Sequence, residues 1–427
     1  MNTRHKARQA ATGIARAVAA VVFCVTTACN TTHVTDASDT GGPPTALTAL
    51  PRALTANEVQ IRDAANDFSF RLMGTVSDAQ TAANVFISPL STSFALGMTM
   101  NGAGGTTLTE MQGALQLGNL TQPQMNAAYN SLLTLLVSID PSVKFQIANS
   151  IWYRNSFPFN QAFIDTTQKY FFAKVQALNF SDRSTSLAAI NNWVYSATGG
   201  RITKVLDTIT DDQVMFLLNA IYFKGSWREK FDAARTTGGT FTTASGGTQP
   251  VQLMQRTGAM LYRDAPTYQA VDLPYGNSAF SMTVVLPKAG GSLNDVVRNF
   301  TNTTWQALTA SMTTATVNLS LPKIKLAYER QLNSDLKTLG MRTAFTDAAD
   351  FSRLSTERLL ISFVKQNTFV DINEDGTEAA AVTSVGVGTT SVPLAVTMRV
   401  DHPYLFVIRE RLSGTLIFMG RITGVPQ

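Results

Sequence analysis

Cysteine and histidine are both scarce in this chain, and their scarcity excludes whole classes of chemistry. The only cysteines among the 427 residues are Cys24 and Cys29, so everything after residue 29 lacks a disulfide, a thiol nucleophile and a Cys-ligated metal. Of the three histidines, only His402 lies beyond residue 33. A Ser-His-Asp triad would need this one side chain, and a metal site would have at most one imidazole. We interpret His402 as a structural hydrogen-bonding residue and expect neither a metal nor another cofactor.

Charge is also sparse. Charged residues make up 15% of the chain, a composition more typical of exported than of cytosolic proteins. Four of the five net positive charges come from the first sixteen residues, which leaves +1 for the rest. This balance indicates neither a nucleic-acid partner nor a basic membrane-binding surface. The adjacent acids Asp211 and Asp212, and Glu374 and Asp375, are interpreted as solvated turn residues, and the segment "NGAGGTT" lacks the lysine of a phosphate-binding loop.

The first 29 residues have the features of a targeting segment. Basic residues up to Arg16 precede an apolar run from Ala17 to Val25, and small residues lead to Cys29. Two outcomes stay open: lipidation of Cys29 after cleavage, or plain secretion with cleavage near Ala28. Residues 30–56 are rich in Thr, Ala, Pro, Gly and Asp and are predicted to form a disordered tether, which leaves residues 57–427 as the folded domain.

The domain mixes helical and strand patterns without regular alternation. Helical spacing predicts a helix from Asn57 that ends at Gly74, and a second helix that ends near Gly102. Strand patterns dominate the second half, including "FSMTVVLP", "VNLSLP" and a final hairpin that turns at residues 412–414. Helices concentrated early and strands late predict an α+β fold with antiparallel or mixed sheets.

The segment "EDGTEAAAVTSVGVGTTSVP", residues 374–393, fits no ordinary element. As a helix it would be stopped by Gly386, Gly388 and Pro393, and as a linker it has no second domain to join. As a strand it places only small uncharged side chains on the face that includes Thr377, and one charge, Glu378, on the other face. A segment that suits both an exposed loop and a central strand indicates a conformational device.

Nine segments in order give the chain from Asn57 to Ile422 a specific resemblance to the serpins, a family of serine protease inhibitors. They are "NVFISPLSTSFALGMTMNGAGGTT", "ANSIWYR", "INNWVYSATGGRITKVL", "LLNAIYFKGSWREKF", "LPYGNSAFSMTVVLP", "LPKIKL", "LKTLGMRTAFTDAADFS", "FVDINEDGTEAAAVTSV" and "DHPYLFVIRERLSGTLIFMGRI". The resemblance implies one domain of three β-sheets and eight or nine helices, with a reactive-centre loop at about residues 374–400. It also implies that a target protease cleaves the loop and is trapped as an acyl-enzyme while the loop inserts into the largest sheet.

The resemblance also implies roles for individual residues. The hinge of inhibitory serpins matches Glu374, Gly376, Thr377, Glu378, Ala379, Ala380 and Ala381. The usual spacing from Glu374 places the cleaved bond at Thr390-Ser391, with Thr389-Thr390 and the bond at Val392 as alternatives because the loop is slightly long. With no Arg or Lys between Glu378 and Pro393, elastase-like or subtilisin-like proteases are the expected targets.

A polar cluster where the sheet opens is implied as well, matched by Ser88, Ser91, Asn219, Gln366 and Trp227. Gln366 stands where the family commonly has histidine. Gln still donates and accepts hydrogen bonds but cannot become charged, so a pH-dependent gate is not expected here. The expected protein is a non-enzymatic, exported, monomeric inhibitor that forms a covalent complex with a serine protease. The alternative is a non-inhibitory serpin that serves as a binding or storage protein.

Overall fold

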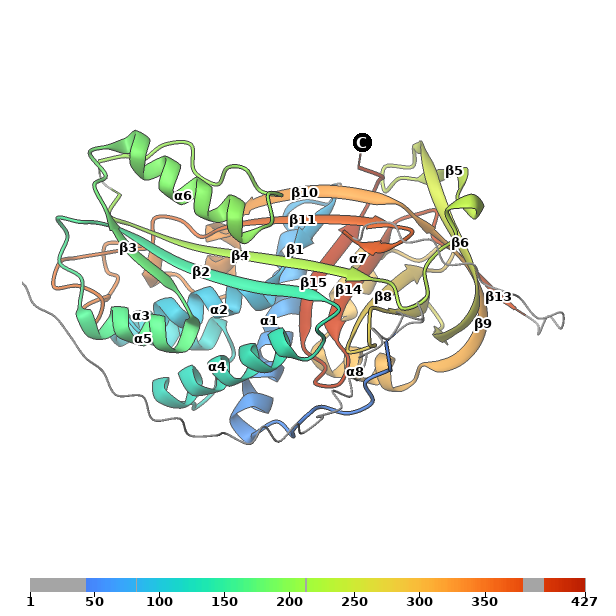
Figure 1. The fold of residues 1–427 in the computed structure, drawn as a ribbon, viewed down its shortest axis with the longest axis horizontal. Coiled ribbons are helices and arrows are strands. Elements are labelled where there is room, and N and C mark those ends of the chain that lie inside the picture. The colour runs from blue at the N-terminus through green and yellow to red at the C-terminus, as the bar shows by residue number, and fades with distance from the viewer. Residues whose placement is uncertain (1–43, 82, 212, 379–394, 427) are drawn as a thin grey trace, which may run out of the picture. The chain divides into compact units, whose positions relative to one another are not determined.

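The computed structural model describes residues 44–81, 83–211, 213–378 and 395–426. Among them a six-stranded sheet lies across the molecule (Figure 1). Its order is β10 (Ile324–Gln331), β11 (Lys365–Asn373), β12 (Gly376–Thr377), β4 (Met215–Ser226), β2 (Lys144–Arg154) and β3 (Lys174–Leu178). Neighbouring strands are antiparallel except for β2 and β3, which run parallel.

A nine-stranded sheet is built mainly from the second half of the chain. Its path is β1 (Val85–Ile87), β15 (Leu416–Ile422), β14 (Tyr404–Glu410), β8 (Phe280–Pro287), β7 (Tyr268–Pro274), β6 (Thr248–Asp264), β9 (Thr313–Pro322) and β13 (Val396–Arg399), with β5 (Thr237–Thr242) paired to β6. The predicted α+β class is confirmed. The described strands form two continuous sheets where the resemblance implies three, because the 17-residue β6 pairs with β5, β7 and β9 and joins their strands into one sheet.

Nine α-helices occur in the described residues, within the expected number. They are α1 (Ala56–Ala79), α2 (Pro89–Met100), α3 (Gly105–Ala114), α4 (Gln122–Ser138), α5 (Gln161–Phe171), α6 (Arg183–Ala197), α7 (Leu293–Asn299), α8 (Asn302–Ala310) and α9 (Asn333–Thr338). The structure also has 3-10 turns at Ala233–Arg235 and Thr343–Phe345. None of these helices is long and apolar enough to cross a membrane, within the described ranges.

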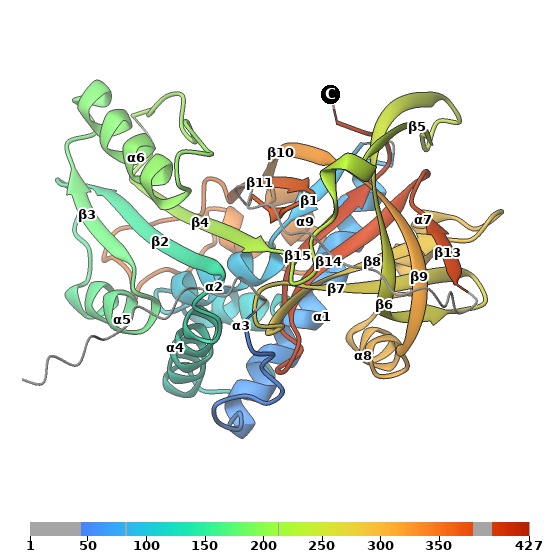
Figure 2. The same ribbon diagram turned by 45° about the vertical axis from the view of Figure 1, so that its right-hand side comes forward.

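The six-stranded sheet is covered on both faces. Helix α6 packs against one face, where Ile190 and Val194 join a small core with Trp152, Phe216 and Leu218 from the strands. The opposite face packs on the main core, to which α2 contributes a helix with nearly every residue buried. Figure 2 shows α6 outside the sheet and α2 behind it. A strand added between β11 and β4 would therefore face α6 on one side and the main core on the other.

Helix α1 is longer than its sequence suggests. A capping box of Thr55 and Glu58 begins it, but it continues past Gly74 to Ala79, so the prediction that Gly74 ends it is wrong. A glycine inside a helix costs about 1 kcal/mol relative to alanine. Burial of the next turn, where Val76 is fully enclosed, outweighs this cost.

The described part of the predicted tether, residues 44–56, lies against the domain. The Leu47 amide donates a 2.7 Å hydrogen bond to the Asn277 carbonyl oxygen. Arg52 bonds Glu58 and also donates to the Ser131 hydroxyl at 2.8 Å. Order therefore begins before the predicted boundary at Asn57. Cys29 and the rest of the targeting segment lie outside the described residues.

Candidate functional site

The loop segment singled out in the sequence begins inside the six-stranded sheet. Its first residues form β12, which pairs with β11 on one side and β4 on the other. Thr377 lies opposite Ile372 of β11 and Gly225 of β4. The register gives no ladder between β11 and β4 themselves in the described ranges, so the two strands are joined through β12. The start of the loop thus occupies the position of a central strand.

Gly376 makes this docking sterically feasible. Its φ of +151° is a conformation that side-chain-bearing residues rarely adopt. A Cβ atom here would lie 2.1 Å from the Gly225 carbonyl oxygen and 2.7 Å from the Ser226 Cα. Both obstacles are backbone atoms that cannot rotate away, so only glycine fits β12 at this position.

The two acids before β12 anchor its entry by ion pairs. The Glu374 carboxylate accepts from Lys323 Nζ at 2.8 Å and from the Thr236 hydroxyl at 2.7 Å. Although burial opposes ionisation, these donors lower the pKa of Glu374. Asp375 pairs with Lys230 at 3.0 Å. Glu374 and Asp375 lie in a turn, as interpreted, but the expectation that they are simply solvated is wrong, because each is partly buried and has a cationic partner.

Thr377 points into the main core. It is 2% exposed, and its hydroxyl lies 2.7 Å from the Tyr275 hydroxyl. Tyr275 stacks on Trp227 at a ring-centroid distance of 4.4 Å. The Trp227 indole N–H in turn donates to the Asn373 carbonyl oxygen at 2.9 Å. Trp227 therefore packs on the core side of β12, just beyond the end of β4.

Glu378 points to the opposite face, toward the segment after α6. Its φ of +56° turns the chain out of the extended conformation, while its amide still donates to the Asp371 carbonyl oxygen at 2.8 Å. Arg201 Nε donates to its carboxylate at 3.1 Å, and Tyr222 is a second hydrogen-bond partner. Burial raises the pKa of Glu378 in spite of both donors. The carboxylate in turn raises the pKa of Arg201.

Farther along the gap between β11 and β4, Gln366 organises the polar cluster expected from the sequence. Its side-chain oxygen accepts from the Ser88 amide at 3.0 Å, and its nitrogen donates to the Ser88 carbonyl oxygen at 2.7 Å and the Thr92 hydroxyl at 2.9 Å. Ser88 also caps α2 and donates to the Ile417 carbonyl oxygen at 2.7 Å. A neutral amide thus ties β11 to α2 and the other sheet.

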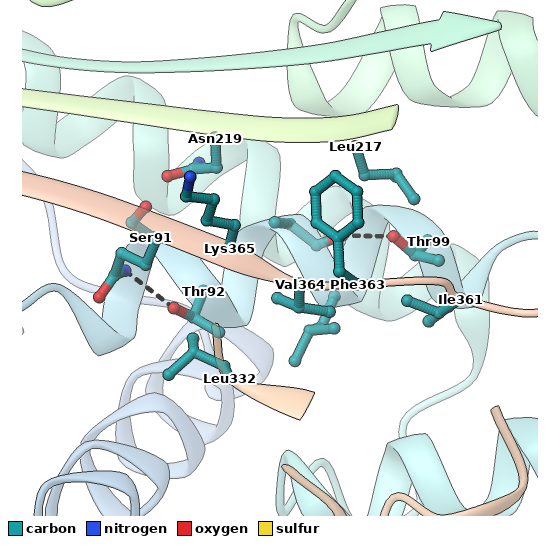
Figure 3. Close-up of a pocket in the computed structure, with 13 residues that line it drawn as sticks. Ser91, Thr92, Thr99, Leu217, Asn219, Leu332, Ile361, Phe363, Val364 and Lys365 are labelled. Atoms are coloured by element: carbon teal, nitrogen blue, oxygen red, sulfur yellow. Dashed lines mark hydrogen bonds between the residues drawn. The ribbon is translucent and has the colours of Figure 1, made fainter. Parts of the chain in front are cut away.

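A cavity of about 30 Å³ lies beside this cluster, lined by residues of α2, β4 and the segment 361–366. Figure 3 shows Ser91 and Asn219 at this cavity together with apolar side chains such as Leu217 and Phe363. The Ser91 hydroxyl and the Asn219 side-chain oxygen are buried and have no hydrogen-bond partner in the described protein. The cavity is large enough for a water molecule, and these two atoms would bind it.

Four of the five predicted sheet-opening residues are thus close together, and Trp227 lies apart at the hinge. Of the predicted hinge residues, Glu374, Gly376, Thr377 and Glu378 lie in or beside β12, while Ala379, Ala380 and Ala381 lie outside the described residues. The same holds for the predicted bond Thr390-Ser391. His402 has both ring nitrogens in contact, with Asp401 at 2.9 Å and the Pro287 carbonyl oxygen at 2.8 Å. No group of three or more potential metal ligands occurs in the part of the chain that is described.

Sequence reasoning missed several contacts of the hinge. Arg201, Tyr222, Tyr275 and Lys323 come from four separate parts of the chain, and nothing in their local sequence points to residues 374–378. Tyr275 lies in the segment "LPYGNSAF" that carried the resemblance, but its role needed the contact with Thr377. Contacts between residues so distant in sequence can be identified only once the tertiary structure positions the strands.

Comparison with known proteins agrees with this geometry. The family model described as "Serpin (serine protease inhibitor)" matches residues 63–425. Serine protease inhibitor 42Dd of Drosophila melanogaster is 33% identical over 354 residues, covering 81% of this chain and 93% of that protein. Human Serpin B8 is 34% identical over 370 residues, covering 84% of this chain and 98% of that protein.

Solved structures resemble the fold closely. The native state of the thermophilic serpin tengpin aligns with a TM-score of 0.79 and 30% identity, covering 89% of this chain and 97% of that one. Human thyroxine-binding globulin aligns with a TM-score of 0.80 at 24% identity, covering 87% of this chain and all of that one. At this lower identity the second likeness concerns the fold alone.

Proposed function

This chain belongs to the serpin family of serine protease inhibitors, and from that premise we propose that it traps its target as a suicide substrate. The protease serine attacks a carbonyl carbon in the loop after Glu378. An ester forms between the two proteins, and the amide bond breaks to release a new amino terminus. The freed loop then continues β12 between β11 and β4 as a full strand and moves the attached protease to the far end of the sheet.

One observation carries this proposal: the first loop residues already pair with both β11 and β4. Continued insertion extends a ladder that has begun. Thr377 fits the core side of the sheet with its hydroxyl paired to Tyr275, and the three alanines that follow Glu378 in the sequence present little steric obstruction. These features suit a hinge that enters a sheet.

Loop insertion would release a substantial free energy. About twelve new ladder hydrogen bonds at ~1 kcal/mol each contribute on the order of 10 kcal/mol. Burial of apolar side chains such as Val385 and Val387 adds roughly 1.5 to 3 kcal/mol for each. The total is comparable with the whole free energy of unfolding of an ordinary domain, ~5 to 15 kcal/mol.

We propose Thr390-Ser391 as the cleaved bond, and elastase-like or subtilisin-like enzymes as the targets. A small side chain before the bond fits a small apolar specificity pocket, and the loop offers no basic residue for an acidic one. Incubation with pancreatic elastase and with subtilisin should give an SDS-resistant complex and a C-terminal peptide that begins at Ser391. Cleavage without complex across a broad panel of serine proteases would refute inhibition.

A hinge variant tests insertion directly. Thr377→Arg places a charged side chain against the buried Tyr275 hydroxyl, so the variant should be cleaved as a substrate without forming the complex. Thr303→Arg, on the exposed surface of α8, is the matched control and should inhibit like the parent protein. Equal complex formation by both variants would contradict the strand-insertion mechanism.

The alternative function, a non-inhibitory binding or storage protein, makes a different thermal prediction. Insertion after loop cleavage should raise the melting temperature strongly, since the new strand stabilises the sheet. A melting temperature unchanged by cleavage would favour the alternative.

We also propose that the protein is exported and monomeric, either cleaved near Ala28 or lipidated at Cys29. The sequence of the first 29 residues supports this proposal. Mass spectrometry of the mature N-terminus distinguishes the two forms by the mass of the acyl groups, and size-exclusion chromatography with light scattering tests the monomer. A mature protein that retains residues 1–28 would refute export by this route.

A further inference from the structure

An apolar groove of about 700 Å³ lies between α4, β2 and α6, on the side of β2 away from β4 and β12. This volume is in the range of roughly 300–1,000 Å³ that is usual for ligand sites. Its walls include Leu133 and Val137 of α4, and Trp193 of α6. Val137 is 44% exposed, and Phe172 at the groove is 57% exposed, which makes it the most exposed of the large apolar side chains in the described residues. The groove therefore has apolar walls that the described residues leave partly exposed.

Phe172, which lines the groove, adopts an unfavourable backbone conformation. It ends α5 with a φ of +51°, the left-handed conformation that helix ends usually assign to glycine or asparagine. An aromatic residue at this φ is uncommon. A strained backbone that directs an exposed aromatic ring to a groove points to a surface with a binding role.

The groove runs along an open sheet edge. Gln146, Ile147 and Ala148 all line it, and consecutive strand residues point to opposite faces, so the groove follows the backbone of β2. Strand β3 pairs with β2 only over Ser150–Arg154, although β4 pairs with it from Lys144 onward. Figures 1 and 2 both show β3 beside one end of β2, with α4 and α6 on either side of the remainder.

The register tells which backbone groups face this edge. The Arg154 amide donates to Val214 on the β4 side at 2.9 Å. Because alternate residues of an antiparallel strand bond to the same neighbour, the even-numbered residues of β2 bond to β4. Phe145 and Ile147 therefore turn their N–H and C=O groups to the open edge, where no described strand pairs with them, whereas Asn149 lies next to Ser150, at which β3 begins to pair.

The elements that border the groove carry more basic than acidic residues. Lys144, Lys169 and Lys174 stand against the single acid Asp165, while Arg154 and Arg183 lie at the other ends of β2 and α6, beside Asp211. Lys144 and Lys174 bracket the open edge on the face toward α6, with their ammonium groups over the rings of Tyr222 and Trp152. Lys174 pairs with Ser150, so the two lysines are six strand residues apart, about 20 Å.

We propose that this edge binds an extended peptide segment of a partner protein by strand addition, with apolar side chains toward α4 and acidic residues at both ends. Strand addition uses the free backbone groups of β2, the apolar walls take alternate side chains, and the two lysines select acids about six residues apart. A second copy of this chain is not the expected occupant, because it would present the same lysines. The chain's own loop after Glu378 has no acid in residues 379–394.

The test uses the intact protein and the synthetic peptide Glu-Val-Thr-Val-Thr-Val-Glu, whose end carboxylates are six residues apart. Fluorescence anisotropy should show saturable binding that is at least about tenfold weaker when both glutamates are replaced by lysine. Two N-methylated isomers provide the backbone control, one methylated at the valines and one at the threonines. An added strand pairs along one edge only, so one isomer should lose binding by about tenfold or more and the other should retain it.

Protein variants locate the site. Val137→Glu adds an acid to the exposed groove wall and Lys174→Glu reverses the charge at one end, and each should weaken binding of the peptide by about tenfold. Lys337→Glu, on α9, is the control and should bind normally. Unchanged binding by Val137→Glu, or equal loss for both methylated isomers, would overturn the proposal. Dimerisation of the protein that Val137→Glu abolishes would also overturn it, since the edge would then pair with a second copy.

Discussion

Replacing Arg201 with alanine should make loop insertion faster, because Arg201 holds Glu378 in the conformation that precedes insertion. Glu378 is 5% exposed and has a φ of +56°, whereas a residue in an inserted strand has an extended backbone with negative φ. The contact between Arg201 Nε and the carboxylate, 3.1 Å long, therefore belongs to the state before insertion.

The magnitude follows from burial. Removing the partner of a fully buried charge costs about 3–5 kcal/mol, but the Arg201 side chain is 42% exposed and solvent screens part of the interaction. Tyr222 also remains as a donor. We expect a loss of about 1–2 kcal/mol from the native state. If the contact is absent in the transition state of insertion, the rate should rise by roughly 5- to 30-fold.

The assay follows insertion without a protease, as the loss of inhibitory activity at a temperature just below unfolding. Arg183→Ala is the matched control, because Arg183 pairs with Asp211 at 2.6 Å but both side chains are mostly exposed. Such a pair contributes about 0–1 kcal/mol, so this variant should lose activity at nearly the parent rate. Equal rates for Arg201→Ala and the parent protein would refute the reasoning.

Three further predictions concern buried polar groups. Burial raises the pKa of Glu378, so the stability that this carboxyl group contributes is present below the ordinary glutamate pKa and is lost as the pH rises. Glu378→Gln should therefore raise the melting temperature at pH 7.5 and have little effect at pH 4. Glu58 has the opposite pH dependence. Although burial opposes ionisation, donors including Arg52 lower its pKa to about 2. Glu58→Gln should therefore lower the free energy of unfolding by about 1–2 kcal/mol at neutral pH, as measured by urea unfolding, and by progressively less as the pH falls from 4.5 toward 2. Gln366→Ala leaves the Ser88 amide and carbonyl without their partner and should lower the free energy of unfolding by about 1–3 kcal/mol, whereas an unchanged value would contradict the tie between β11 and α2.

Local patterns were sufficient for the fold class, whereas the hinge residues were assigned through the family resemblance. The alternating apolar residues of "FSMTVVLP" predicted β8, and Gly102 was correctly placed just beyond α2. The prediction that Gly74 ends the first helix was wrong because local propensity does not account for the buried turn that follows this residue. Glu374 was misinterpreted for the same kind of reason, since Lys323 and Thr236 are distant in sequence.

The amino-acid sequence by itself determined which residues are able to enter a sheet: Gly376 with no Cβ, Thr377 with a small polar side chain, and alanines after the single charge of Glu378. It did so because steric size and charge are properties of each residue alone. Only the tertiary structure decided that β12 is already docked between β11 and β4, that Arg201 and Tyr275 contact its two faces, and that no described strand pairs with the outer edge of β2 before Ser150. Those features depend on strand register and on contacts between residues as many as 177 positions apart, which no local pattern encodes.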